Sequence, residues 1–542
     1  MTVRAAESRR VVVIGGGVSG LATAALLAHD GCRVTLLEQQ DVVGGRAGLW
    51  EADGFRFDTG PSWYLMPEVF DHFFRLLGTS TAEQLDLVTL DPGYRLFAQG
   101  STQTPGGDAP LDIRSDGAAN RALFESVEPG AAAALDCYLA SASETYRLAV
   151  DRFLYATYAS PRPLLDPAVL RRLGRLARLL VEPLDRYAAG FVHDTRLRQL
   201  LGYPAVFLGT SPTRAPSMYH LMSHLDLDDG VRYPMGGFAE LIARVAALAE
   251  AAGADLLTRA RVVGIRTDTR GGRARVCGVE WADASGARHV TEADLVVSAA
   301  DLHHTETQLL PPELRTHPER LWRRRDPGPG AVLAMLGVRG DLPQLAHHNL
   351  FFTTDWEAGF ARVFGARPGI PDPASLYVCK PSATDPGVAP AGHENLFVLV
   401  PVAADVSIGA GGVDGAGDRI VERTADAAIA QVAAWAGIPD LADRIVVRRT
   451  VGPDDFAQRF NAWRGGALGL AHTLRQSAFF RPGNASRRVD GLLYAGSSTI
   501  PGIGLPMCLI SAELIVKRLR GDASAERLAE PLAPAARAER VR

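Results

Sequence analysis

The sequence predicts an α/β fold: a doubly wound, Rossmann-like domain for a dinucleotide, an inserted α+β region, and an additional helical region. Three observations predict it. The chain opens on a strand, a glycine turn, a helix and a second strand between residues 11 and 38, which is the order of a Rossmann unit. A further strand, Gly/Pro-rich loop and helix follow at 491–519. The 542 residues exceed one hydrophobic core, so at least two domains are expected.

The first unit has clear element boundaries. Residues 11–14 form a short β-branched run, typical of a buried parallel strand. A helix is expected over 21–29 and ends at Gly31, a residue that often terminates helices. Residues 33–37 form the second strand. The unit therefore has the strand–helix–strand order that presents a helix N-terminus to a ligand.

The turn of this unit carries a nucleotide-binding motif. Gly15, Gly17 and Gly20 have the G-x-G-x-x-G spacing, in which the glycines permit a tight turn, close approach of a pyrophosphate and packing of the helix on the sheet. Glu38 ends the second strand and is placed to accept hydrogen bonds from ribose hydroxyls. The strand–turn–helix context makes a merely structural glycine turn a poor explanation.

The residues after Glu38 distinguish FAD from NAD. Gly44, Gly45 and Arg46 form a Gly-Gly-Arg sequence, which resembles the extension that flavin amine oxidases and carotenoid desaturases share. An NAD domain would instead continue into further βα units. A guanidinium such as that of Arg46 can pair with phosphate; the alternative is a surface arginine. The following small residues would bring the backbone close to the flavin ring: Gly60, Pro61 and Ser62.

Two later segments complete the expected FAD site. A helix over 237–252 precedes a strand with Val262, and in the resembling flavoproteins this strand places a backbone valine beside the adenine. Near the C-terminus a strand turns at Gly496, and a Gly/Pro loop leads into another helix. The residues of that loop would approach the flavin tail: Gly504, Leu505 and Pro506.

The combination resembles the bacterial- and fungal-type phytoene desaturases over about residues 11–519. Amine oxidases usually carry an acid directly after the last glycine turn, and here the residue is Ser497, which favours the desaturase branch. Other carotenoid-modifying flavoenzymes (a late-pathway desaturase, a ketolase or an isomerase) stay open. A flavin amine oxidase and a non-enzymatic isoprenoid carrier of the Rab GDP-dissociation-inhibitor type also stay open, with less support.

The resemblance implies the desaturation of phytoene or a related acyclic carotenoid. A hydrocarbon offers no polar handle, so its tunnel should be apolar; hydride transfer to the flavin leaves an allylic cation that a weak base or water deprotonates. His472 and Arg481 are candidates for stabilising or deprotonating the cation, although a structural role is the simpler expectation for each. No second dinucleotide motif is present, and the resemblance implies quinone or oxygen as electron acceptor.

Composition limits the partners and the location. The formal net charge of −4 gives no general attraction to nucleic acid. Five cysteines that are scattered along the sequence predict a reducing compartment and no metal site. No signal peptide and no spanning helix are recognisable. The expected location is the cytoplasm, with the protein bound peripherally to the inner face of the cell membrane.

A basic amphipathic stretch at 169–190 is the expected membrane contact. Arg171, Arg175 and Arg178 lie on one helical face, and such a helix can lie in the headgroup region; the alternative is a helix packed on the core with its arginines in water. The leucines lie on another face: Leu170, Leu173, Leu176 and Leu180.

The segments combine into the following expected organisation. The FAD-binding domain comprises residues 1–75, 226–305 and 451–520. The substrate domain comprises 76–225 and 306–450 and includes the membrane-docking helices at about 120–200. A tail rich in Ala, Arg, Glu and Pro, 521–542, is expected to be disordered.

Overall fold

A five-stranded parallel sheet forms the centre of the computed structural model, which describes residues 9–100, 109–159, 167, 171–365 and 367–533. The strand order is β20-β13-β1-β2-β9. The strands come from three separate parts of the chain: β1 (Arg10–Ile14) and β2 (Arg33–Leu37), β9 (Asp255–Leu257) and β13 (Leu295–Ser298), and β20 (Leu492–Tyr494). This sheet confirms the predicted Rossmann-like core.

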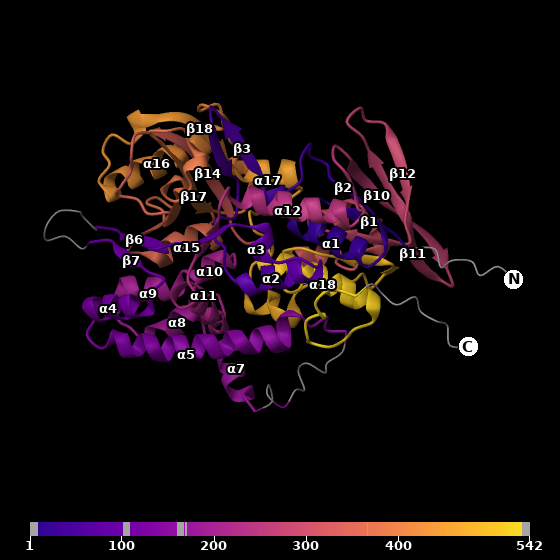
Figure 1. The fold of residues 1–542 in the computed structure, drawn as a ribbon, viewed down its shortest axis with the longest axis horizontal. Helices are drawn as coiled ribbons and strands as arrows, with labels where there is room; N and C mark the ends of the chain where they lie inside the picture. Colours follow the sequence, from indigo (N-terminus) through magenta and orange to yellow (C-terminus); the bar gives the residue numbers. More distant parts are fainter. Residues whose placement is uncertain (1–8, 101–108, 160–166, 168–170, 366, 534–542) are drawn as a thin grey trace.

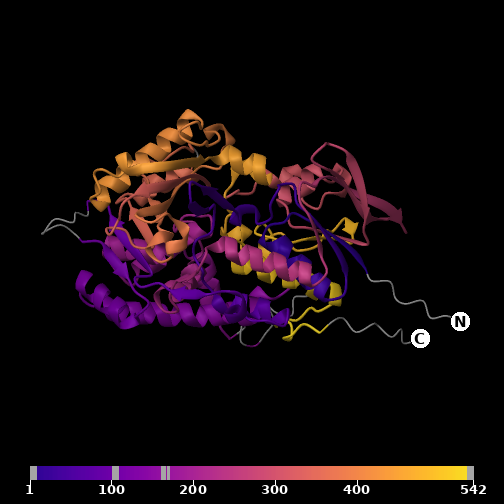
Figure 2. The same ribbon diagram turned by 45° about the horizontal axis from the view of Figure 1, so that its top comes forward.

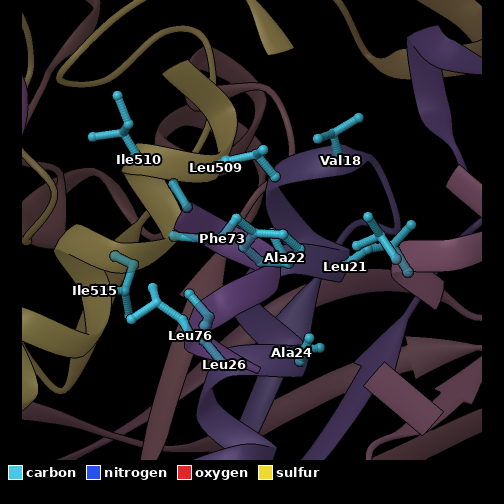
Figure 3. Close-up of a cluster of buried hydrophobic side chains, with 14 of the residues drawn as sticks. Val18, Leu21, Ala22, Ala24, Leu26, Phe73, Leu76, Leu509, Ile510 and Ile515 are labelled. Carbon is cyan, nitrogen blue, oxygen red and sulfur yellow. The ribbon is translucent and has the colours of Figure 1, made fainter. Parts of the chain in front are cut away.

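The helices that cover this sheet pack closely because the alanines of one helix leave room for the larger side chains of its neighbours. Helix α1 (Val18–His29) lies between α12 (Phe238–Ala251) and α18 (Leu505–Arg520) and is buried along most of its length. Alanines of α1 permit the approach of α18 and α2 (Pro67–Leu76), whose leucine, isoleucine and phenylalanine side chains meet it in Figure 3. The helix begins at Val18 rather than at Leu21 as expected, because Gly17 already has the extended conformation of an N-cap.

A second, four-stranded sheet extends from this core, on the right in Figure 1. It contains β10 (Arg261–Arg270), β11 (Arg273–Ala282), β12 (Arg288–Glu292) and β19 (Val489–Asp490). Gly271 and Gly272 both have positive φ, as the tight hairpin turn between β10 and β11 requires. The chain leaves the parallel sheet after β9, forms β10, β11 and β12 of the second sheet, and returns to the parallel sheet as β13.

A mixed seven-stranded sheet forms the other lobe, in the order β18-β14-β17-β16-β15-β6-β7 (Figures 1 and 2). Helix α16 (Arg419–Ala436) covers one face, and an apolar cluster fills the space between them. The strands are β6 (Tyr94–Ala98), β7 (Leu111–Ile113), β14 (Gly330–Arg339), β15 (His348–Phe352), β16 (Leu376–Cys379), β17 (His393–Val402) and β18 (Ile445–Val451). Its strands come from two parts of the chain: β6 and β7 precede the segment that contains β9 and β13 of the parallel sheet, and β14 to β18 follow it.

A layer of helices lies below the seven-stranded sheet in Figure 1. It contains α4 (Gly117–Val127), α5 (Ala131–Ala149), α7 (Leu173–Val181), α8 (Leu184–Ala189), α9 (Thr195–Gly202), α10 (Pro204–Phe207) and α11 (Met222–Leu227). Smaller elements connect the layers: the strand pairs β3 (Leu49–Ala52) with β4 (Phe55–Asp58) and β5 (Leu87–Thr89) with β8 (Arg232–Pro234), and the helices α13 (Leu302–Gln308), α15 (Trp356–Phe364) and α17 (Pro453–Phe460).

The expected continuous helix over 169–190 is wrong. The chain breaks at Glu182 and Pro183, because proline cannot continue a helix here, and α7 and α8 are separate. Arg175 is not on a free basic face: its guanidinium and that of Arg172 both bind Glu144 of α5. Arg171 and Arg178 are exposed, while Leu170 lies outside the described residues.

The expected disorder after residue 520 does not hold for residues 521–533. This segment, which we call the C-terminal strap, packs against α1, α2 and α18: the Leu532 amide donates to the Leu76 carbonyl at 2.9 Å, and the Leu528 amide donates to Glu513 at 2.7 Å. Its charged composition predicted disorder, but Leu528 and Leu532 join the apolar core. Residues 534–542 lie outside the described residues.

None of the helices in the described part of the chain has the length and apolar character needed to span a bilayer.

Candidate functional site

One cavity of about 870 Å³ runs from the glycine turn of the parallel sheet to the seven-stranded sheet and the helical layer. Most of the predicted site residues line it, although they come from distant parts of the chain. They are Gly15, Gly17, Glu38, Gly45, Arg46, Gly60, Pro61, Ser62, Val262, Gly496, Gly504, Leu505, Pro506 and His472. Among the described residues, Gly20 and Arg481 are the two predicted ones that do not line it.

The glycine turn forms an open cradle at one end of the cavity. A Cβ on Gly20 would lie 1.9 Å from the Gly15 carbonyl oxygen, so this position is needed for backbone packing. A Cβ on Gly17 would meet nothing within 4 Å among the described residues, so the space in front of it is free for a ligand. Gly17 provides no side-chain cap for α1, and the first N–H groups of the helix are available to an anion.

Glu38 closes the cradle on the side of the second strand. Its buried carboxylate accepts hydrogen bonds from the Gly16 amide at 2.6 Å and the Gln40 amide at 2.8 Å. Each carboxylate oxygen can accept more than one hydrogen bond, so both retain capacity for hydroxyl donors. Backbone bonds fix the position of Glu38, and this arrangement suits a ribose.

Arg46 is half-buried and brings a positive charge with a buried Nε to the cavity, and no carboxylate of the described residues lies within ion-pair distance of it. Its Nη2 reaches the Gly466 carbonyl at 3.5 Å, its Nε has no hydrogen-bond partner among the described residues, and it forms no ion pair with them. Burial lowers the pKa of the guanidinium. A cation with a buried nitrogen is costly unless an anion pairs with it. The orphaned Nε, the free space at Gly17 and the Glu38 carboxylate together fit the phosphates and ribose of FAD.

The C-terminal loop forms the opposite wall of this half. The Gly496 amide donates to the Ser511 hydroxyl at 3.1 Å, which fixes the end of β20 to α18. Gly504 has a φ of 120° and begins α18 without a side-chain cap, so Leu505 and Pro506 bring a second helix N-terminus to the cavity. The loop therefore lines the same cavity as the glycine turn, and its contacts with FAD stay a prediction.

His472 is held by two hydrogen bonds that define its protonation. The Ile503 amide donates to Nε2 at 3.1 Å, so Nδ1 carries the proton and bonds the Tyr219 hydroxyl at 2.6 Å. Burial lowers the pKa of His472 well below its ordinary value, and the charge of Arg481 lowers it further. Because Nε2 is already occupied, the geometry favours a positioning role for His472 in the loop that carries Ile503.

Arg481 holds the same loop from behind. Its guanidinium donates to the carbonyl oxygens of Thr499 at 3.1 Å, Gln476 at 2.9 Å, Leu470 at 2.8 Å and Ser497. The side chain is buried, and these carbonyls use its donors. We therefore assign Arg481 to the support of the Ser497–Gly504 loop rather than to contact with a substrate.

The other half of the cavity is lined by apolar side chains from elements that the motifs did not indicate. These residues include Phe153, Leu154, Leu176, Leu180, Phe207, Met218, Met222, Leu350, Phe352, Trp356, Leu399 and Phe479. A polar exception lies near Pro61, where the Ser62 and Tyr377 hydroxyls are 2.7 Å apart and the Tyr377 hydroxyl bonds His348 Nδ1 at 2.7 Å. Sequence reasoning missed Tyr377, because an aromatic in a strand has no distinguishing pattern.

Comparisons with known proteins agree with this geometry. Residues 18–519 match the family "Flavin containing amine oxidoreductase". The chain is 40% identical to a carotenoid 3,4-desaturase of Haloarcula japonica, over 94% of this chain and 98% of that protein. It is 36% identical to a zeta-carotene-forming phytoene desaturase of Myxococcus xanthus, over 96% and 95%.

A solved structure shares the fold. An oxidoreductase from Methanosarcina mazei superposes with a TM-score of 0.59 at 17% identity, covering 94% of this chain and 100% of that one. From the family match and the full-length similarity to the desaturases, the chain belongs to the flavin-containing amine oxidoreductases and, within them, to the FAD-dependent carotenoid desaturases.

Proposed function

We propose that this desaturase introduces double bonds into phytoene or a related acyclic carotenoid. One observation carries the proposal: a single cavity joins the glycine and arginine cradle to a half lined by apolar side chains. A long hydrocarbon fits such a half because its binding needs apolar surface and little hydrogen bonding. The residues that would hold FAD are those of the cradle, with Glu38 toward the ribose and Arg46 toward the phosphates or the ring.

The protein's part in the chemistry is to place the chain and to exclude water. FAD, when bound, supplies the acceptor for a hydride from an allylic C–H. The apolar wall keeps the polyene beside the cofactor half and keeps bulk water from the allylic cation. Loss of a proton from the neighbouring carbon to a weak base or to a single water molecule completes the double bond. The electrons then pass to a quinone or to oxygen, because no second dinucleotide motif offers another route.

A second candidate is 3,4-desaturation of a carotenoid that is already conjugated. The observation that favours it is the 40% identity to a protein of that name from Haloarcula japonica. Both candidates use the same cavity and the same type of bond. They differ in where along the polyene the reactive carbon pair lies.

Product chromatography distinguishes the two candidates. The FAD-loaded protein is incubated in liposomes with phytoene, and separately with a conjugated acyclic carotenoid that is saturated at C3–C4. Conversion of phytoene to more conjugated products supports the first proposal. Conversion of the second substrate alone supports 3,4-desaturation, and conversion of neither contradicts both.

We also propose that the rim of the cavity contacts a membrane surface. Leu173, at the start of α7, and Phe479 line the cavity and are 56% and 40% exposed. Phe480 follows Phe479 and is 52% exposed, and Val181, at the other end of α7, is 74% exposed. Large apolar side chains rarely gather on a surface without a partner. Arg171 and Arg178 are exposed on the same segment, and their charge complements anionic lipid. A carotenoid could enter the cavity from the bilayer through this rim.

A further inference from the structure

A cluster of two histidines and one cysteine lies behind the wall of the cavity. His348 is in β15, Cys379 is its direct partner in the neighbouring strand β16, and His347 precedes His348 in the chain. One ligand-capable atom from each residue lies within 4.8 Å of those of the other two. All three residues are buried. The cluster could not be predicted from the sequence, because Cys379 is distant along the chain from both histidines and from the other cysteines.

The two imidazoles are oriented in the same unusual way. His347 Nδ1 bonds the Thr384 hydroxyl at 2.8 Å, and His348 Nδ1 bonds the Tyr377 hydroxyl at 2.7 Å. The opposite nitrogen, Nε2, is buried and has no hydrogen-bond partner among the described residues in either ring. A buried polar atom without a partner is rare and calls for a water or an ion. A hydroxyl on Nδ1 that leaves Nε2 free is the arrangement found around metal-binding histidines.

We propose that His347, His348 and Cys379 bind a thiophilic d10 metal ion, Zn²⁺ or Cu⁺, through two imidazole nitrogens and one thiolate. Imidazole and thiolate are the ligands that these ions prefer, whereas Mg²⁺ and Ca²⁺ prefer oxygen. Binding releases the thiol proton to solvent, and the sulfur keeps the electron pair that it gives to the metal. The ion would cross-link β15 to β16 directly behind Tyr377, and behind Trp63, whose ring stacks on His348 at 4.6 Å. It would therefore stiffen one wall of the cavity.

Metal analysis of the full-length, FAD-loaded protein tests the proposal. We expect about one equivalent of zinc or copper per chain, as purified or after anaerobic incubation with Zn²⁺ or Cu⁺ followed by desalting. C379S and H348N should lose it, and C137S, which changes an exposed cysteine, should keep it. T384V removes only the hydroxyl on His347 Nδ1 and should weaken binding about tenfold. Binding by wild type that does not exceed that of C379S overturns the proposal.

A spectroscopic measurement on the wild-type chain keeps the proposal testable if the buried variants fail to fold. Co²⁺ bound to a thiolate gives a charge-transfer absorption that oxygen and nitrogen ligands do not give. The difference spectrum of the protein with and without Co²⁺ should contain this band, and added Zn²⁺ should remove it. Absence of the band at saturating Co²⁺ would count against thiolate ligation and overturn the proposal.

Discussion

The first glycine turn contains two glycines whose substitution should have opposite consequences. G20A places a Cβ 1.9 Å from the Gly15 carbonyl oxygen, and such overpacking costs about 1–3 kcal/mol of unfolding free energy. G17A meets open space, and Gly17 has a φ of −73° that alanine adopts readily. We expect G17A to keep its stability and to bind FAD at least about tenfold more weakly, about 1.4 kcal/mol.

Two measurements separate these effects. Denaturant unfolding of the apoprotein should show a lower stability for G20A than for wild type, and the wild-type stability for G17A. Titration with FAD, followed by flavin fluorescence, should show weaker FAD binding by G17A than by wild type. If G17A binds FAD as wild type does, the pyrophosphate does not lie in front of Gly17 and the assignment of the cradle is wrong.

Arg46 supplies a second test at this scale. Because the guanidinium of this half-buried residue has no ion pair with the described residues, R46Q should leave the stability of the apoprotein unchanged or raise it. The same change should weaken FAD binding about 10–100-fold, because a charge-assisted contact with the cofactor is lost. The thermal midpoint of unfolding is measured with and without FAD. The matched control is R56Q, because Arg56 is a half-exposed arginine paired with Glu51. A larger loss of stability in the apoprotein than in the FAD-loaded protein would contradict this role.

Sequence reasoning at the residue scale was most successful where backbone geometry restricts the residue type. The glycines of the first turn and Glu38 stand in a motif whose spacing follows from the geometry of a strand, a turn and a helix, whereas Arg46 was indicated by the resemblance to flavoproteins. Tyr377 and Trp63 could not be found in this way, since their importance depends on which strands become neighbours. His472 was a candidate for stabilising or deprotonating the cation, and the Ile503 amide on its Nε2 indicates a positioning role instead.

Helix α7 and the loop at 479–480 are the elements that the membrane proposal concerns. The double variant L173S/F480S should cost little stability, because both side chains are more than half exposed. Burial of one such side chain in lipid contributes about 1.5–3 kcal/mol, so partitioning to anionic liposomes should fall about tenfold or more. Flotation of the protein with anionic liposomes measures this partitioning.

The control for this experiment is V290S on β12. Val290 is 50% exposed, and β12 lies far from α7 in Figure 1. Equal binding by wild type and L173S/F480S would refute the assignment of the rim. Arginine variants are less suitable, because Arg175 is bound to Glu144 and its loss would disturb α5.

The C-terminal strap gives an element-scale prediction about pH. Burial lowers the pKa of His72, but hydrogen bonds to Glu513 at 2.9 Å and to Glu530 outweigh it and raise that pKa above its ordinary value. The contact therefore stabilises the fold fully below a pH of about 6.5, the unfolded pKa, and loses this contribution as pH rises through the folded pKa. We expect the strap to become easier to cleave by protease at high pH.

The variant H72Q should remove this dependence. Its cleavage rate in the strap should be nearly independent of pH, whereas H224Q, at a histidine paired with Asp228, should behave as wild type. Mass spectrometry of the fragments locates the cut. A strap that is equally resistant at both ends of the pH range in wild type would show that His72 does not hold it.

At the scale of the whole molecule, local sequence patterns predicted the parallel sheet, but they could not predict which distant strands pair in the seven-stranded sheet. The parallel sheet was predictable because motifs follow its central strand β1 and its edge strand β20, and the motifs of one cofactor must meet. The order of the seven-stranded sheet was not, because β6 pairs with β15 about 250 residues later and nothing local determines that partner. The far wall of the cavity belongs to this sheet, so the sequence indicated its apolar character but not its residues.

The central claim is that a flavin and a polyene occupy the two halves of one cavity and react directly. An anaerobic single-turnover experiment tests it: the FAD-loaded protein is mixed with the carotenoid that it converts, and absorbance is followed in time. The account predicts that the oxidised flavin band bleaches at the rate at which the longer-conjugated product appears, with one flavin reduced per double bond formed. Product formation while the flavin stays oxidised, or bleaching by an amine but not by any polyene, would contradict it.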